Sequence, residues 1–241
     1  MFPARRAVFF SMLLCSVASG KTVVLWQPGF PAIASEAPDR ATLGKAFEGM
    51  DPVFADIATL NDPHTLADAD LLVLPYGSAA PVDAWKSIQR YLDGGGNLLI
   101  LGGQPLRVPV SLHDGSYQPG RPQDSYSRIL GLRHTYEVPV AADASFVWRD
   151  GYATGAALQM KAKRFFAVEG RLNGLGYMKD SSVLLVAAPV IVADHDSGDS
   201  MLGSRFVALD FDPQPGYWAS PDGIALIHRA ADYARQGATV F

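Results

Sequence analysis

Cysteine is almost absent from this sequence of 241 residues, which holds a single one, Cys15. One thiol excludes a framework of intramolecular disulfides and any zinc site built from several cysteines. An apolar core must therefore hold the fold together, and a hydrophobic content of 49% is enough to supply one. The five histidines are dispersed along the chain, without the spacing of metal ligands. We expect no metal and no other cofactor.

The residues around Cys15 indicate that even this thiol is lost from the mature protein. Arg5 and Arg6 precede an apolar stretch over residues 7–17, and small residues follow it as far as Gly20. That order is typical of a secretory signal peptide. We predict a signal peptide over residues 1–20 and a secreted or periplasmic mature chain.

Long apolar runs and runs of basic residues are missing as well. The apolar stretch near the amino end has about eleven residues, too few to cross a bilayer, so we predict no stable membrane span in the mature chain. The formal charge is −4, and removal of the signal peptide makes it more negative. Such a surface repels phosphate backbones, which argues against nucleic-acid binding.

The most informative part of the chain runs from Ala69 to Arg107. Two short apolar runs, 70–74 and 98–101, predict buried strands. Between them, Pro81 predicts the first turn of a helix, and apolar residues recur behind it at helical spacing. Glycines 94–96 close that helix. The segment therefore predicts one βαβ unit with a right-handed crossover.

The remaining elements predict an α/β fold, in which an open, mostly parallel sheet is flanked by helices and interrupted by an insertion of loop and β structure. Residues 21–241 form one domain in this interpretation, with the insertion at about 105–165. Ser220 is expected to cap the last helix, and Ser78 lies in the region expected to cap the helix near Pro81. The other expected elements are strands at 22–26, 53–57 and 165–168, a loop at 27–38, a helix at 41–47, and a hairpin of strands 183–192 and 206–211.

Two segments carry a resemblance to a known family. They read ADLLVLPYGSAAPVDAWKSIQRYLDGGGNLLILGGQP and GSRFVALDFDPQPGYW, and the second precedes the last helix. Together they resemble the class I glutamine amidotransferase-like, flavodoxin-like domains, particularly those associated with bacterial secreted glycoside hydrolases. The resemblance covers residues 22–107 and 183–236, and it implies the same α/β scaffold.

The resemblance also implies where a nucleophile would stand. The amidotransferase reaction needs a cysteine on a sharp turn between a strand and a helix, where backbone amides stabilise the thiolate and the oxyanion. Here the turn after the strand at 98–101 holds Gly102, Gly103 and Gln104, and the cysteine position falls at or beside Gln104. Pro105 then removes one amide from the turn. We therefore expect a pseudoenzyme without amidotransferase chemistry and assign no catalytic residue.

Ligands of open α/β sheets bind beyond the carboxyl ends of the strands. Aromatic rings pair with the apolar faces of sugars, while amides and carboxylates bind hydroxyl groups, so aromatic and polar residues at that edge suit a carbohydrate. The alternative is that the tryptophans cover the sheet edge and pack under the loop at 27–38. The candidate ligand-binding residues are Trp26, Tyr76, Gln104, Asp212, Tyr217 and Trp218.

Three functions stay open at the level of the sequence. The leading hypothesis is a secreted, non-catalytic domain that binds a glycan or a glycoside hydrolase partner. The second is a hydrolase of the glycosidase type that uses Asp210 and Asp212, two residues apart on a predicted strand, or a bound metal. The third is a purely structural interaction domain.

Overall fold

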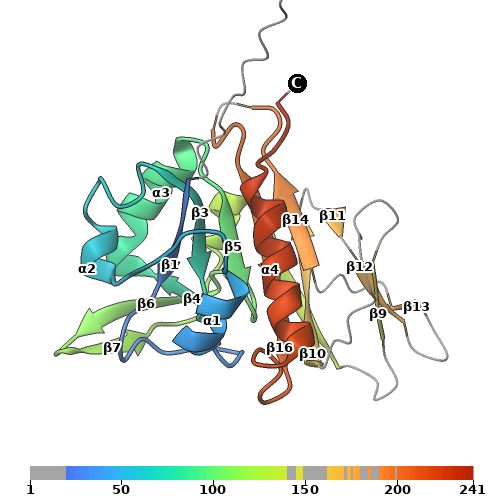
Figure 1. Cartoon of the computed structure of the whole chain (residues 1–241). Helices are drawn as coiled ribbons and strands as arrows, with labels where there is room; N and C mark the ends of the chain where they lie inside the picture. Colours follow the sequence, from blue (N-terminus) through green and yellow to red (C-terminus); the bar gives the residue numbers. More distant parts are fainter. Residues whose placement is uncertain are drawn as a thin grey trace, which may run out of the picture.

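The computed structural model describes residues 20–139, 145–148, 162–170, 173–174, 176–179, 184–185, 190–198 and 200–240. Its centre is a seven-stranded sheet in the order β11-β14-β15-β5-β3-β1-β2 (Figure 1). Five neighbouring strands, β2, β1, β3, β5 and β15, run parallel to one another. Strands β14 and β11 are antiparallel to their neighbours. Their bounds are β1 Lys21–Leu25, β2 Pro52–Ala55, β3 Ala69–Leu74, β5 Leu98–Leu101, β11 Asn173–Gly174, β14 Val190–Asp194 and β15 Arg205–Leu209.

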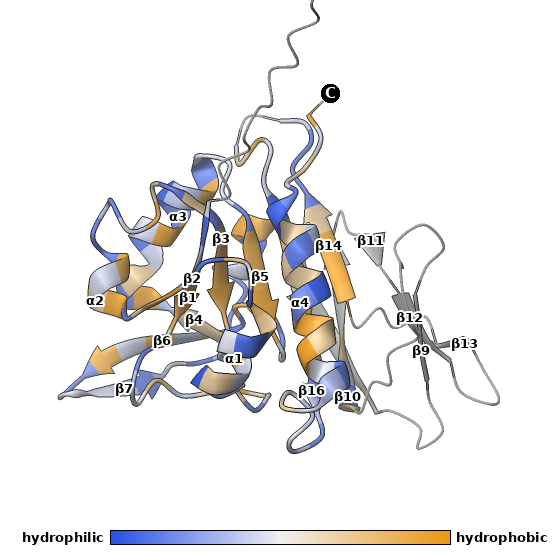
Figure 2. Ribbon diagram, in the orientation of Figure 1, coloured by the Kyte–Doolittle hydropathy of each residue, from blue (hydrophilic) through white to orange (hydrophobic). Residues whose placement is uncertain are grey.

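Helices cover both faces of this sheet. On one face α1 (Arg40–Ala46) and α4 (Pro221–Arg235) pack on alternate strand residues such as Val73 and Leu99. On the other face α2 (Ile57–Leu60) and α3 (Trp85–Asp93) pack on residues such as Leu72. Figure 2 shows the central strands as strongly hydrophobic and the covering helices as mixed. This confirms the predicted α/β class, because strands buried on both faces read as continuous apolar runs.

Side chains cap the helices where polar residues precede them. The Ser220 hydroxyl accepts a hydrogen bond from Gly223 N at 3.1 Å, so the predicted cap of α4 is confirmed. Asp39 caps α1 through Thr42 N at 2.7 Å, and this hydrogen bond lowers the pKa of the Asp39 carboxyl. None of the described helices has the length and apolar character that a membrane crossing needs.

The start of α3 differs from the prediction. Pro81 ends the short strand β4 (Ala79–Pro81) instead of opening the helix, and a 3₁₀ turn, η1 (Val82–Ala84), leads into α3. The reason is a parallel pairing between β4 and β6 (Val108–His113), which holds this stretch extended. Ser78 therefore makes no cap for the helix, and no side chain caps α3.

Three smaller sheets surround the central one, in the orders β4-β6-β7, β16-β10-β8 and β13-β12-β9. Of their nine strands, β6, β7, β8 and β9 fall in the segment at about 105–165 expected to be an insertion of loop and β structure, and β10 begins at its end. One 3₁₀ turn, η2 (Ser127–Leu130), also lies there. The bounds of the strands not yet given are β7 Ser116–Pro119, β8 Leu132–Pro139, β9 Ser145–Trp148, β10 Ala162–Gly170, β12 Gly176–Lys179, β13 Leu184–Leu185 and β16 Phe211–Pro213.

The predicted hairpin near the carboxyl end is confirmed as β14 and β15, with Val192 opposite Val207. Both of its strands are shorter than predicted. The run 183–192 contains β13 and β14, which belong to different sheets, and residues 186–189 lie outside the described part. The run 206–211 is divided at Asp210, where the chain passes from β15 in the central sheet to β16 in a smaller one.

Candidate functional site

The carboxyl ends of β1, β3, β5 and β15 meet at one edge of the sheet, called the carboxyl edge below. Hydrogen bonds join the chain after β5 to the chain after β15: Gly102 N donates to Leu209 O at 2.9 Å, and Gly103 N donates to Phe211 O at 3.0 Å. All six candidate residues follow strands that end here, as the open-sheet rule predicts. The structure thus brings their backbones to one edge.

The two glycines of the turn after β5 have no room for side chains. Gly102 and Gly103 have φ values of +78° and +68°, which disfavour residues with a Cβ. A Cβ at Gly102 would lie 2.0 Å from the Ser35 hydroxyl oxygen, and one at Gly103 would lie 2.5 Å from Ser78 N. Two serines from other loops therefore occupy the space around this turn.

Gln104 is held by the same arrangement. Its backbone N–H donates to the Ser78 hydroxyl oxygen at 2.7 Å, and its side chain is half-buried. After a short turn the chain enters β6, so the backbone amides at this position do not belong to the first turn of a helix. The helix start that would lower a thiol pKa and bind an oxyanion is missing here, in addition to the thiol itself.

Trp26 and Tyr76 lie side by side, with ring centroids 6.4 Å apart. Trp26 is half-buried and also contacts Phe54 edge-on at 6.3 Å. Tyr76 is only 7% exposed. Its hydroxyl accepts a hydrogen bond from Gln27 N at 2.8 Å and donates one to Gln27 O at 3.2 Å. Burial raises the pKa of Tyr76. Trp26 is therefore the member of this pair with an accessible ring.

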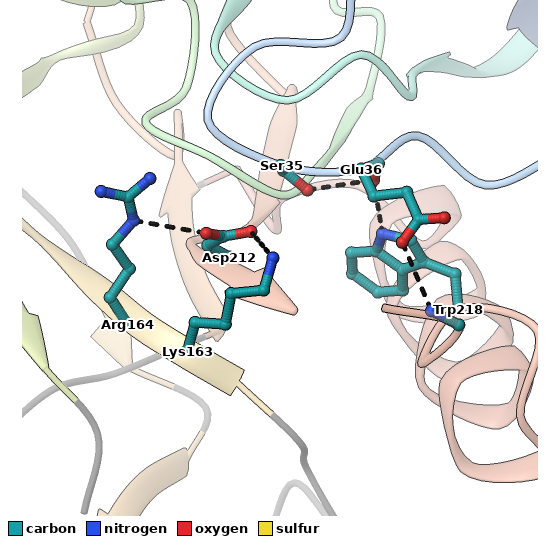
Figure 3. Close-up of polar contacts among 7 residues, drawn as sticks. Ser35, Glu36, Lys163, Arg164, Asp212 and Trp218 are labelled. Carbon is teal, nitrogen blue, oxygen red and sulfur yellow. Dashed lines mark hydrogen bonds and ion pairs between the residues drawn. The ribbon is translucent and has the colours of Figure 1, made fainter. Parts of the chain in front are cut away.

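Tyr217 and Trp218 form a second aromatic group around Phe211, at centroid distances of 6.0 and 5.2 Å. Each is 3% exposed. The Trp218 indole N–H donates to Glu36 O at 2.7 Å, and Gly216 N donates to a carboxylate oxygen of Glu36 at 3.3 Å (Figure 3). Trp218 thus packs under the loop at 27–38, the position that the alternative interpretation gave it.

The two aspartates differ in environment. Asp212 is 6% exposed and lies 3.7 Å from Lys163 Nζ and 3.3 Å from Arg164 Nε, both on β10 (Figure 3). Asp210 is fully buried, neither of its carboxylate oxygens has a hydrogen-bond partner, and burial raises its pKa well above the usual value. A substrate at the surface cannot reach Asp210, so this structure does not present the pair for acid–base catalysis.

Among the residues that the structure describes, no group of three His, Cys, Asp or Glu side chains is placed to hold a metal ion. The aromatic candidates form two groups, Trp26 with Tyr76 and Tyr217 with Trp218. Gln104 belongs to neither group, and its backbone N–H is bonded to Ser78. The sequence interpretation missed Ser35 and misassigned Ser78, since both act through contacts with glycines distant in the sequence.

The order β2-β1-β3-β5-β15 and the glycine turn after β5 define a class I glutamine amidotransferase-like fold without its nucleophile. The comparisons with solved structures agree. A GH42 β-galactosidase from G. stearothermophilus, in a catalytic mutant form, matches with a TM-score of 0.54 at 12% identity, over 92% of this chain and 31% of that one.

Two further structures match over most of this chain. The exo-β-1,4-mannosidase Op5Man5 from Opitutaceae bacterium strain TAV5 has a TM-score of 0.51 at 13% identity, covering 92% of this chain and 36% of its own. The mmIFT52 N-terminal domain has a TM-score of 0.54 at 11% identity, covering 92% and 100%. At such identities the likeness shows the fold alone. The chain spans about a third of the length of the β-galactosidases it matches. No family model and no curated protein matches the sequence.

Proposed function

We propose that this chain is a non-catalytic amidotransferase-like domain that accompanies glycoside hydrolases and acts by docking against a hydrolase module. One observation carries the proposal: Gln104 holds the position at which the resemblance places the nucleophile, and Ser35 and Ser78 fill the space around the two glycines before it. The scaffold is kept while its reactive position is filled, which leaves binding as the remaining role of this edge.

The matched enzymes support the choice of partner. In a β-galactosidase and a mannosidase, a region of this fold makes up about a third of a longer chain that carries a glycoside hydrolase. Docking of this chain would reproduce such an arrangement between separate proteins.

A glycan is the second candidate ligand, and Trp26 favours it. Its ring and the Gln104 side chain are both half-buried at the carboxyl edge, and sugars bind to combinations of ring and amide. Docking remains the better supported role, because Tyr76, Tyr217 and Trp218 are buried and offer no free ring face in this structure.

Two measurements test the proposal on the full chain. Incubation with glutamine should release no ammonia, and measurable release would contradict the non-catalytic assignment. The tagged chain should co-elute from source cells with glycosidase activity, assayed with chromogenic galactosides and mannosides. Trp26→Ala and Gln104→Arg should reduce co-elution. Leu202→Ser, which changes an exposed apolar residue on the β14–β15 turn, is the matched control. Retention on immobilised polysaccharide without any co-eluting glycosidase would favour the glycan instead.

We propose further that the protein is exported, with residues 1–20 as a cleaved signal peptide. Support comes from the sequence pattern and from the start of β1 at Lys21, directly after the expected cleavage point. Amino-terminal sequencing of material from the periplasm or medium should begin at Lys21. Replacing Arg5 and Arg6 with glutamate should leave the chain in the cell; export that is unaffected by this change would contradict the assignment.

A further inference from the structure

A second site lies at the opposite edge of the sheet, near α2 and α3 (Figure 1). There a cavity of about 300 Å³ opens between α3 and the segment that follows α2. The exposed Pro63 and Ala67 provide apolar surface, and Asp62, Ser87, Arg90 and Tyr91 add polar groups and a ring. Its volume is at the lower end of the range for small-molecule pockets. None of the six candidate residues lines it, so it is separate from the carboxyl edge.

One wall of the cavity is rigid. Ser87, Arg90, Tyr91 and Gly94 recur on one face of α3 and its end at helical spacing. The Tyr91 hydroxyl donates to Asn97 O and accepts from Asn97 N, both at 3.0 Å. A Cβ at Gly96 would lie 2.4 Å from Tyr91 Cζ, so the glycine turn packs directly on the ring. The ring is therefore fixed before any ligand arrives, which lowers the entropic cost of binding.

Both walls of the cavity keep unused hydrogen-bonding groups. Arg90 is exposed and, within the described part of the chain, has no ion-pair or hydrogen-bond partner for its guanidinium. Asp62 uses one carboxylate oxygen to accept from His64 N at 2.9 Å, which leaves the second oxygen available. Ser87 donates to Asn61 at 3.3 Å and keeps its own acceptor capacity. A ligand here meets donors and acceptors together.

The charges around the cavity select the class of ligand. A phosphate or another strong anion would meet Asp62 and the negative end of the α3 dipole, and a cation would meet Arg90. A wholly apolar molecule would desolvate both charged groups without replacing their hydrogen bonds. A neutral ring with several hydroxyl groups satisfies donor and acceptor alike, and its apolar face can rest on Tyr91 or Ala67.

From this combination we infer that the cavity between α3 and the segment 61–69 binds a neutral hexose unit, with Arg90 and Asp62 as its polar contacts. Arg90 donates to ring hydroxyl oxygens, and Asp62 accepts from hydroxyl groups. The inference goes beyond the proposed docking role and does not depend on it, because the two sites lie at opposite edges of the sheet.

Nuclear magnetic resonance titration of the full chain tests the inference, with D-galactose and D-mannose as probes. Saturable shifts are expected at the backbone amides of glycines 94–96, which border the cavity. Arg90→Gln and Asp62→Asn should each weaken binding by about tenfold or more, because each removes a charge-assisted hydrogen bond. Lys86→Gln is the matched control, since it removes an exposed positive charge of α3 that does not line the cavity.

The outcomes separate the possibilities. D-glucuronate, which adds a carboxylate to the same ring, should bind no more tightly than the neutral hexoses. Saturation by glucuronate alone would overturn the inference in favour of an anion site. Shifts confined to Trp26 and Gln104, or no saturable shift with either hexose, would overturn it as well. Failure of the glycosidase co-elution above leaves these readouts unchanged, so the two proposals fail separately.

Discussion

Asp210 has unfavourable surroundings for a carboxyl group. Its carboxyl group is fully buried and has no hydrogen-bond partner, whereas its backbone carbonyl accepts from Phe166 N at 3.2 Å. Burial of an unpaired carboxylate is costly, and the group responds by keeping its proton. Residue 210 lies where the chain passes from β15 to β16. The backbone is needed at this position, whereas a charged side chain here would destabilise the fold.

Asp210→Asn should therefore stabilise the protein at neutral pH. In the unfolded chain an aspartate has a pKa of about 3.9, whereas burial raises the folded pKa of Asp210. The folded state then holds more protons, so wild-type stability falls as pH rises from about 4 through the folded pKa. Urea unfolding across this pH range should show that fall reduced in the variant.

Asp39→Asn should change the pH dependence of stability in the opposite direction. The hydrogen bond from Thr42 N lowers the pKa of Asp39, so the contribution of that carboxylate is lost as pH falls through its folded pKa. A loss of stability at neutral pH in Asp210→Asn would show that the carboxylate has a partner and would refute the assignment.

Gly103 provides a second prediction at the level of single residues. Gly103→Ala must place a Cβ 2.5 Å from Ser78 N at a φ of +68°, so it meets both backbone strain and a clash. Gly115→Ala, in the turn of the β6–β7 hairpin, has a similar φ of +79° but nothing within 4 Å. We expect a loss of about 1–2 kcal/mol for Gly115→Ala and about 1–3 kcal/mol more for Gly103→Ala. Equal losses in chemical unfolding would mean that the space around Gly103 is open.

At the scale of elements, the loop at 27–38 connects the parts of the carboxyl edge. Ile33 N donates to Tyr76 O at 3.2 Å, Ser78 N donates to Ile33 O at 2.8 Å, and Trp218 holds the far end of the loop at Glu36. Two of the rings selected as ligand-binding candidates are thus anchors of this loop. The loop covers the glycine turn because Ser35 stands over Gly102.

Trp218→Phe removes the hydrogen bond to Glu36 while keeping an aromatic ring. Hydrogen exchange of the backbone amides at 33–36 should become faster, and stability should fall by about 1–3 kcal/mol. Trp85→Phe is the matched control, because Trp85 is also buried but packs on Tyr126 at the other face of the sheet. Equal acceleration in both variants would show that the loop does not depend on the indole N–H.

The sequence predicts local features of this fold well. The strands at 69–74 and 98–101 are continuous apolar runs, and the Ser220 cap needs only its own helix. Prediction from the sequence fails where contacts between residues distant in the chain determine the local structure. Pro81 is extended because β6 pairs beside it, and the rings near the carboxyl edge are buried by a loop whose path local patterns do not specify. The edge itself was predictable, whereas the exposure of the side chains on it was not.

At the scale of the whole molecule, one sheet has two apolar faces. Ile88 of α3 and Ile227 of α4 are both fully buried, but they pack on opposite faces. Since the same strands form both cores, the two faces should unfold together.

Ile88→Ala and Ile227→Ala should each destabilise the protein by about 2–5 kcal/mol, because both leave a cavity in a packed core. Unfolding followed by fluorescence and by circular dichroism should give one transition, shifted to lower denaturant with an unchanged slope. A second transition in only one variant would show that the faces unfold independently.

The position of β15 has a consequence for how the protein is made. This strand, Arg205–Leu209, lies between β5 and β14, so β5 keeps an open edge until synthesis has passed residue 209. Residues up to 209 must therefore leave the ribosome before the central sheet can close. If residues 1–20 are the export signal proposed above, this delay would keep the polypeptide in a state that can still be threaded through a translocation pore.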